Sequence, residues 1–271
     1  MYWESRLCRE IDLLKFKKYL KQLPSLQEVY PSFGIPEGIK HRKNWEWGFI
    51  IYVLDKARMI KEGKRGLGFA VGEEPLPSYF AGRGVQILAT DLWEENSSEQ
   101  WFDHQNLKGN KRVLNRYALC SPEKFEKNLE IRNINMNSIP DDLKDFDFCW
   151  SSCAVEHVGS LDLGKEFFIN QLNVLKSGGI SVHTVEFNVS SNEDTIEMGD
   201  TAIFRKCDIE NIAACVNASG GEMVCTFKNG WFAGDKFVDT PPYYHTNRHF
   251  HLHLDIEGYN CTSYGIVIRK K

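Results

Sequence analysis

Three glycines followed by an aspartate point to a binding site for a nucleotide-like ligand. Gly66, Gly68 and Gly72 lie in the stretch GLGFAVG, and Asp91 closes the apolar run VQILATD further along. A glycine lets the backbone approach a ligand closely, and a carboxylate at the end of the next strand can bind both hydroxyls of a ribose. The spacing departs from the nicotinamide pattern G-x-G-x-x-G, and the two glutamates that follow Gly72 would repel a pyrophosphate. These residues favour a nucleoside cofactor without phosphates; the alternative is a glycine-rich turn that binds nothing.

A second set of candidate residues follows two later apolar runs. Glu156 and His157 come after FDFCWSS, and Glu186 lies near the end of GISVHTVEF. All three fall at the carboxyl edge of the expected sheet, where α/β enzymes bind ligands. Histidine titrates near neutral pH, so His157 is suited to take a proton from a substrate. We predict these three residues to be catalytic; the alternative is that they brace the next helix or hold a loop.

A third candidate region is the stretch PPYYHTNRHFHLHLD near the end of the chain. On one continuous strand His249, His251 and His253 would share a face, a spacing that can bind a transition metal, although a polar strand face explains the same alternation. We expect no metal and assign the stretch to the acceptor pocket, where an arginine would suit a phosphorylated or nucleotide-linked acceptor. The predicted substrate-binding residues are Tyr243, Tyr244, His245, Arg248 and His251.

The elements that must position these residues alternate between strands and helices. Apolar runs predict strands at 85–91, 129–137, 146–152 and 179–187, and helical spacing predicts helices at 162–176 and 208–221. The alternation indicates a Rossmann-like, doubly wound and mainly parallel α/β sheet, with a C-terminal antiparallel strand. Helical patterns at 4–22 and 45–60 flank a Pro/Gly-rich connector. We therefore divide the chain into an N-terminal helical extension, 1–44, and one α/β domain, 45–271, with Trp45 and Glu46 as lesser site candidates.

The composition is that of a globular, soluble protein. The 271 residues include 33 basic and 37 acidic side chains, a formal charge of -4 that leaves no broad positive surface for nucleic acid. The first residues lack the apolar core of a secretory signal, and the longest uncharged apolar run, GFIIYVL, is too short to cross a membrane. Eight scattered cysteines form no C-x-x-C pair, which favours reduced thiols and a cytoplasmic protein without a membrane partner.

Several of these motifs together resemble class I S-adenosylmethionine-dependent methyltransferases. The resemblance spans about residues 45–271, through GLGFAVGEEPLPSYFAGRG, ATDL, FDFCWSSCAVEHVGS, LKSGG and HTVEFN. Within that superfamily the chain is similar to methyltransferases of bacterial surface-polysaccharide and sugar modification. The family usually carries an acid near the end of the third strand, whereas this chain reads NINMN there, where a backbone N–H can substitute.

The resemblance implies roles for individual residues. Asp91 would bind the ribose, and Ser151 with Ser152 would lie where cofactor and substrate meet. The methionine part of the cofactor would be bordered by Gly66, Gly68 and Gly72. The adenine would be bordered by Met136 with Asn135 or Asn137.

The sequence as a whole predicts methyl transfer from S-adenosylmethionine to a small polar acceptor such as a sugar, a sugar nucleotide or a phosphorylated metabolite. The first choice of accepting atom is an oxygen, and the second is a nitrogen. The donor carries its own activated sulfonium, so the protein need mainly hold the nucleophile in line, and a dedicated base is optional. Two rivals are a nicotinamide-dependent oxidoreductase acting on sugars, which the glycine spacing disfavours, and a non-catalytic binding module with the same fold.

Overall fold

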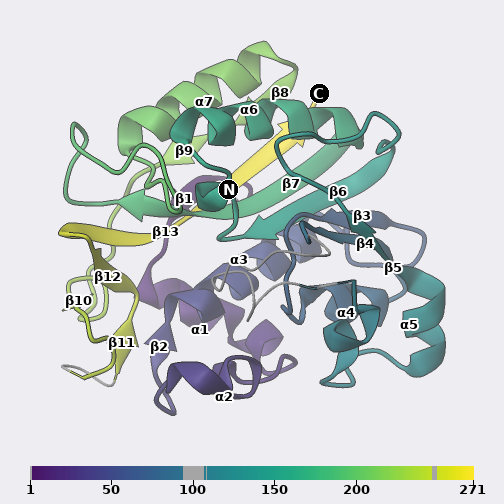
Figure 1. Ribbon diagram of the computed structural model, residues 1–271, viewed down its shortest axis with the longest axis horizontal. Coiled ribbons are helices and arrows are strands. Elements are labelled where there is room, and N and C mark those ends of the chain that lie inside the picture. The colour runs from purple at the N-terminus through teal and green to yellow at the C-terminus, as the bar shows by residue number, and fades with distance from the viewer. Residues whose placement is uncertain (1, 94–106, 108, 246–248) are drawn as a thin grey trace.

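A mainly parallel sheet forms the centre of the molecule (Figure 1). The computed structural model describes residues 2–93, 107, 109–245 and 249–271. The parallel strands lie in the order β5-β4-β3-β6-β7, with bounds Leu129–Asn133, Gln86–Asp91, Arg65–Gly68, Phe146–Ser152 and Leu175–Asn188. The chain order reverses between β3 and β6, and in open α/β sheets ligands bind outside the carboxyl ends of the strands at such a reversal. The predicted doubly wound α/β fold is confirmed.

The second half of the sheet is mixed, with β13 (Tyr259–Lys270) as its long antiparallel strand. β13 runs antiparallel to β7 from Cys261, opposite Asn188, to Arg269, opposite Ile180. This is the predicted C-terminal antiparallel strand. Shorter strands complete this side: β12 (His253–Ile256), β10 (Val238–Asp239), β8 (Gly221–Met223) and β9 (Cys225–Thr226).

The N-terminal segment joins the sheet before it becomes helical. Ser5–Leu7 form strand β1, which pairs with β13 and β9, and helix α1 begins only at Glu10 and ends at Leu20. The prediction of a helix from residue 4 was therefore wrong for residues 5–7. These residues form a strand because β13 offers an edge with which they can pair. The predicted helix at 45–60 is α3, which spans Arg42–Lys56.

Helices cover both faces of the sheet. Figure 1 shows α6 (Leu161–Asn170) and α7 (Lys206–Ala218) on one side, with α1, α3, α4 (Leu76–Ala81) and α5 (Pro122–Asn128) on the other. The core follows the same division, because Phe167, Phe168 and Phe204 pack in one cluster and Trp45, Phe80 and Trp150 in another. The remaining elements are α2 (Leu26–Val29), η1 (Pro31–Phe33), β2 (Lys40–His41), η3 (Lys111–Asn115), η4 (Val155–His157), η5 (Gln171–Val174) and β11 (Phe250–His251).

Helix α3 is buried on nearly every side, which explains its unusual composition. Its residues Trp45, Trp47 and Phe49 are fully buried. Its outer face is covered by α1, and Gly48 allows the close approach, since a Cβ there would lie 2.6 Å from Cβ of Phe16. The N-terminal end of α3 is thereby held against the carboxyl ends of β6 and β7.

No helix among the described residues is long and apolar enough to cross a bilayer.

Candidate functional site

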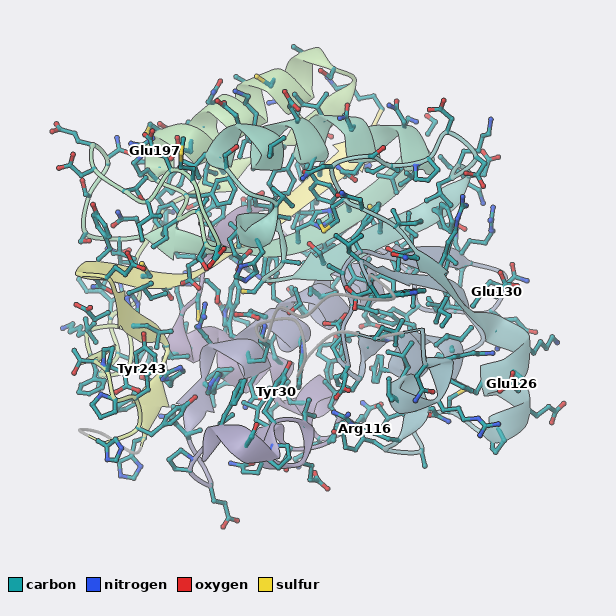
Figure 2. The ribbon with its side chains drawn as sticks, viewed as in Figure 1. Tyr30, Arg116, Glu126, Glu130, Glu197 and Tyr243 are labelled. Atoms are coloured by element: carbon teal, nitrogen blue, oxygen red, sulfur yellow. The ribbon has the colours of Figure 1, made fainter. Side chains whose placement is uncertain are left out.

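A cavity of about 430 Å³ opens at the carboxyl ends of β3, β4 and β6. Its walls come from the turns after these strands and after β5, and from Tyr30, Phe33 and Lys43 of the N-terminal region. Figure 2 labels Tyr30, which lies in that view between α2 and the sheet. The sequence-predicted residues that line the cavity are Gly72, Asp91, Asn135, Met136, Asn137, Ser152 and His157.

The glycines of GLGFAVG divide into two groups. Gly72 lines the cavity and has a φ of 49°, a left-handed conformation that favours glycine. Gly66 and Gly68 lie within β3 and are not among the lining residues. A Cβ on Gly68 would lie 2.5 Å from the Trp150 ring, and one on Gly66 2.4 Å from the Phe148 ring. Aromatic packing from β6 thus accounts for these two glycines, and their contact with a methionine group stays a prediction.

Asp91 lies beside the glycine turn, at the tip of β4. Ala89 pairs with Gly68 across the two strands, and the amide of Val71 donates to the carbonyl of Thr90 at 3.0 Å. The Asp91 carboxylate accepts from the amides of Leu92 at 3.0 Å and Leu107 at 2.8 Å. Burial raises the pKa of Asp91 to about 6, although these amide hydrogen bonds lower it. The cavity wall therefore presents a poorly solvated carboxylate with remaining capacity to accept hydrogen bonds.

The turn after β5 supplies an apolar surface held by two asparagines. The amide of Asn137 donates to Oδ1 of Asn135 at 2.8 Å, and Nδ2 of Asn137 donates to the carbonyl of Val158 at 2.9 Å. These hydrogen bonds tie the turn to the segment after β6. Met136 faces the cavity between them and is 8% exposed. A flat apolar group such as a purine would find a complementary wall here.

The two serines at the end of β6 point in opposite directions. Ser151 is fully buried and its hydroxyl lies 2.8 Å from Nδ1 of His183, outside the cavity lining. Ser152 lines the cavity, and its hydroxyl donates to Oε2 of Glu46 at 3.2 Å. Strand alternation explains the difference, because successive side chains face opposite sides of a sheet. The structure thus places Ser152, rather than Ser151, at the meeting point with helix α3.

Glu156 and His157 also diverge. His157 lines the cavity and its Nδ1 lies 2.6 Å from the carbonyl oxygen of Asp200, which fixes the ring. Glu156 is 2% exposed and does not line the cavity. Its Oε2 has no hydrogen-bond partner among the described residues, and burial raises its pKa. Of these two residues, only His157 is placed to contact a ligand in the cavity.

Glu186 belongs to a buried group of charges behind the cavity wall. Nη1 of Arg42 donates to Oε2 of Glu186 at 2.5 Å. Burial raises the pKa of Glu186 to about 7, although the Arg42 guanidinium lowers it. Oε1 of Glu186 has no partner among the described residues. Glu186 is therefore poised between its charged and neutral forms.

Glu46 is the second carboxylate of this group and differs in being fully paired. Nζ of Lys43 lies 2.8 Å from Oε2 of Glu46, and the Ser263 hydroxyl donates to Oε1 at 2.6 Å. Burial opposes the charged form, but Lys43 and Arg42 hold the pKa of Glu46 well below its usual range. Arg42 and Lys43 escaped the sequence reasoning because they fall at the assigned border of the N-terminal extension. The available signal was two basic residues three and four positions before Glu46, on one helix face.

The C-terminal candidates form a separate cluster beside β2. Nδ1 of His251 lies 2.7 Å from Oδ2 of Asp239, and the ring centroids of His251 and His41 are 4.4 Å apart. The Tyr244 hydroxyl lies 3.2 Å from Nε2 of His41. Tyr243 donates to the carbonyl of Asp255 and lies on the β10–β12 side of the molecule in Figure 2, away from Tyr30. None of these residues lines the 430 Å³ cavity.

The condition for a common histidine face, one continuous strand, is not met. His251 belongs to β11, which pairs with β2, whereas His253 belongs to β12 in the main sheet and lies 3.1 Å from Oδ1 of Asn260. The strand is interrupted at Leu252, so the two side chains have different partners. Within the described residues no group of three or more His, Cys, Asp or Glu side chains is arranged to hold a metal ion. His245 is exposed, and Arg248 lies outside the described residues.

Solved structures share this architecture. A protein of Galdieria sulphuraria described as a sarcosine dimethylglycine methyltransferase is 14% identical, with a TM-score of 0.54 over 94% of this chain and 98% of that one. The 1,6-didemethyltoxoflavin-N1-methyltransferase of Burkholderia thailandensis, solved with S-adenosylhomocysteine, is 10% identical, with a TM-score of 0.52 over 97% and 89%. The cyclase SpnF is 12% identical, with a TM-score of 0.51 over 98% of both chains. No protein-family model and no curated protein sequence matches the chain. The fold is therefore the Rossmann-like fold of S-adenosylmethionine-dependent methyltransferases.

Proposed function

We propose that this protein is an S-adenosylmethionine-dependent methyltransferase acting on a small polar molecule. The observation that carries the proposal is a single cavity in which Gly72, Asp91 and Met136 meet, at the point where the strand order reverses. The fold alone does not decide the reaction, because a cyclase shares it. The assignment therefore depends on whether the lining residues suit the cofactor.

The lining residues suit an adenosyl sulfonium better than a dinucleotide. Asp91 would accept the ribose hydroxyls, and Met136 would lie against the adenine. Asp91 and Glu74 both line the cavity, and Lys43 is paired with Glu46. Because the lysine of the cavity is already paired, a pyrophosphate would find no free lysine counter-charge among the described lining residues, whereas a positively charged sulfonium needs none. This balance disfavours the nicotinamide-dependent alternative.

When bound, S-adenosylmethionine supplies an activated methyl group, so the residues of this chain need to orient the acceptor and accept its proton. His157 lines the cavity and is oriented by the Asp200 carbonyl, which suits it to contact the acceptor. Glu156 and Glu186, behind the wall, are suited to hold the released proton, because burial raises the pKa of both. Tyr243, Tyr244, His245 and His251 would contribute to acceptor binding from the C-terminal side.

The acceptor that we propose first is an oxygen of a sugar, a sugar nucleotide or a phosphorylated metabolite, in the synthesis of a surface polysaccharide. Its support is the sequence resemblance, and no single residue of the cavity is specific for a sugar. An amine is the second candidate, because two of the solved structures that share this fold are named as a sarcosine dimethylglycine methyltransferase and an N1-methyltransferase.

A thermal-unfolding experiment tests the proposed function without knowledge of the acceptor. Saturating S-adenosylhomocysteine should raise the midpoint by several degrees, because a ligand at about 100 times its Kd stabilises the folded state by about 2.7 kcal/mol. NAD and NADH at the same concentrations should leave the midpoint unchanged. A shift with a nicotinamide cofactor and none with S-adenosylhomocysteine would overturn the proposal.

A further inference from the structure

A second cavity, of about 460 Å³, adjoins the cavity that Asp91 lines. Its walls come from α2, η1 and the residues that follow η3, and Figure 2 labels Tyr30 and Arg116 among them. Tyr30, Phe33 and Glu73 line both cavities, so they form the wall that the two cavities share. A ligand in the second cavity would therefore border a ligand in the first.

The shared wall presents a stacked pair of aromatic rings. Tyr30 and Phe33 flank one tight helical turn, which is closed by a hydrogen bond from the Phe33 amide to the Tyr30 carbonyl at 3.2 Å. Side chains at this spacing eclipse one another, and the two ring centroids are 5.4 Å apart with nearly parallel planes. Phe33 is nevertheless 47% exposed. Its ring is thus held in one orientation while much of its surface stays available to a ligand.

An ion pair supplies polar groups to the second cavity. Nη1 of Arg116 donates to Oε2 of Glu73, and the two side chains remain 31% and 27% exposed. Nη2 of Arg116 donates to the Val29 carbonyl at 3.2 Å, and its Nε donates to the Tyr117 hydroxyl at 2.6 Å. That hydroxyl in turn donates to the carbonyl of Glu28 at 2.9 Å. These bonds fix the guanidinium plane and use three of its five hydrogens, which leaves two for a ligand.

The charges of the second cavity favour an uncharged ligand. Arg116 is the only cation among the described residues that line it, and Glu73 already neutralises that charge. Glu28 also lines it, and hydrogen bonds from the amide and hydroxyl of Ser25 lower the pKa of Glu28, so this carboxyl is ionised at neutral pH. A phosphate or carboxylate would meet two negative side chains and no uncommitted cation.

We propose that the second cavity binds the acceptor as an uncharged pyranose ring, which packs on Phe33 and exchanges hydrogen bonds with Arg116 and Glu73. A pyranose has C–H faces that pack on an aromatic ring, and its hydroxyls both donate and accept, as this pair of side chains requires. The volume falls in the range of about 300 to 1,000 Å³ that is usual for small-molecule sites. The inference rests on the proposed function and narrows its acceptor to a neutral sugar. Because Glu73 directly follows Gly72, the bound ring would lie beside the turn assigned to the cofactor.

Saturation-transfer difference NMR on the protein with saturating S-adenosylhomocysteine tests the inference. The probes are the methyl glycosides of glucose, galactose, mannose and rhamnose, with glucose 6-phosphate as a charged counterpart and catechol as an aromatic one. At least one glycoside should receive saturation at its ring protons, and the two counterparts should receive less. Phe33→Ala should weaken the binding of that glycoside by about twofold to tenfold, since the ring contact is lost. Arg116→Gln should weaken it by about tenfold, because hydrogen bonds from a charged donor are lost.

Each variant has a matched control. Phe232 is 48% exposed, as Phe33 nearly is, but it lies between β9 and β10, so Phe232→Ala should leave glycoside binding unchanged. Arg112 is exposed, belongs to η3 and lines neither cavity, so Arg112→Gln removes the same charge as Arg116→Gln without touching the site. Circular dichroism establishes that each variant is folded, and calorimetry gives the S-adenosylhomocysteine affinity of each.

The outcomes separate the inference from the function beneath it. If folded wild-type protein does not bind S-adenosylhomocysteine in calorimetry, the proposed function fails. If it binds S-adenosylhomocysteine but no glycoside receives saturation, the function stands and the pyranose site is overturned. Stronger transfer to glucose 6-phosphate or to catechol than to every glycoside would also overturn it. So would equal losses in the variants and their controls, because the glycoside would then bind elsewhere.

Discussion

The two sides of the cavity are stabilised in different ways. On the side of β3, β4 and β5, polar groups are satisfied mainly by nearby backbone amides: Asp91 accepts from Leu92 and from Leu107, 16 positions away, and Asn135 accepts from Asn137. On the side of α3, β6 and β7, charges from distant segments neutralise one another, as in the pair of Arg42 with Glu186. The first arrangement depends on short stretches of sequence. The second exists only once the whole sheet has formed.

The largest effect should come from breaking the long-range arrangement. Arg42→Ala leaves Glu186 buried without its cation, and loss of one partner of a buried ion pair destabilises a fold by about 3 to 5 kcal/mol. Urea unfolding measures the loss. In the double variant Arg42→Ala with Glu186→Gln, part of the stability should return, because no uncompensated charge remains. Equal stability of the single and double variants would contradict the charge pairing.

A smaller effect should come from overpacking the side of the cavity formed by β3, β4 and β5. Gly68→Ala places a Cβ 2.5 Å from both the Trp150 ring and the Val71 side chain, and overpacking of this kind destabilises by about 1 to 3 kcal/mol. Val71 lines the cavity, so S-adenosylhomocysteine should also bind more weakly. Gly66→Ala, which meets the Phe148 ring instead, should lower stability and leave the affinity nearly unchanged. The distinction fails if both variants alter binding equally.

The effect that is smallest per step of the measurement should appear as a pH dependence at the boundary between the two sides. Glu74 has a pKa of about 8 in the folded protein against an ordinary value of 4.5, so the folded state keeps a proton that the unfolded chain has lost. The unfolding free energy should therefore fall as the pH rises from 5 toward 8, by about 1 kcal/mol per pH unit from this group. Glu74→Gln should flatten the slope in urea titrations. An unchanged slope would show that Glu74 is ionised throughout.

The contrast between the two sides also explains what the sequence could and could not predict. Asp91 and Gly72 were predicted because they lie at or just beyond the end of a strand whose apolar pattern is visible in the chain, and Met136 was predicted from the family resemblance. Gly66 and Gly68 belong to the same motif, yet the packing of Phe148 and Trp150 against them could not be read from it.

The other side was harder to predict because its partners are far apart in sequence. Arg42 meets Glu186 across 144 positions, and Glu46 meets Ser263 across 217. Glu156 and Glu186 were predicted from their positions near strand ends, but strand periodicity could not reveal that neither residue lines the cavity. The break between β11 and β12 was equally hidden, because alternation at 249–254 fits one strand as well as two.

The central claim is that Asp91 and the glycine turn of β3 together bind an adenosyl group. Calorimetric titration of S-adenosylhomocysteine into the wild-type protein and into folded Asp91→Ala tests it most directly. We expect the variant to bind more weakly by about 1 to 3 kcal/mol, because the ribose hydroxyls lose a buried acceptor. An affinity equal to that of the wild type would contradict the claim and remove Asp91 from the site.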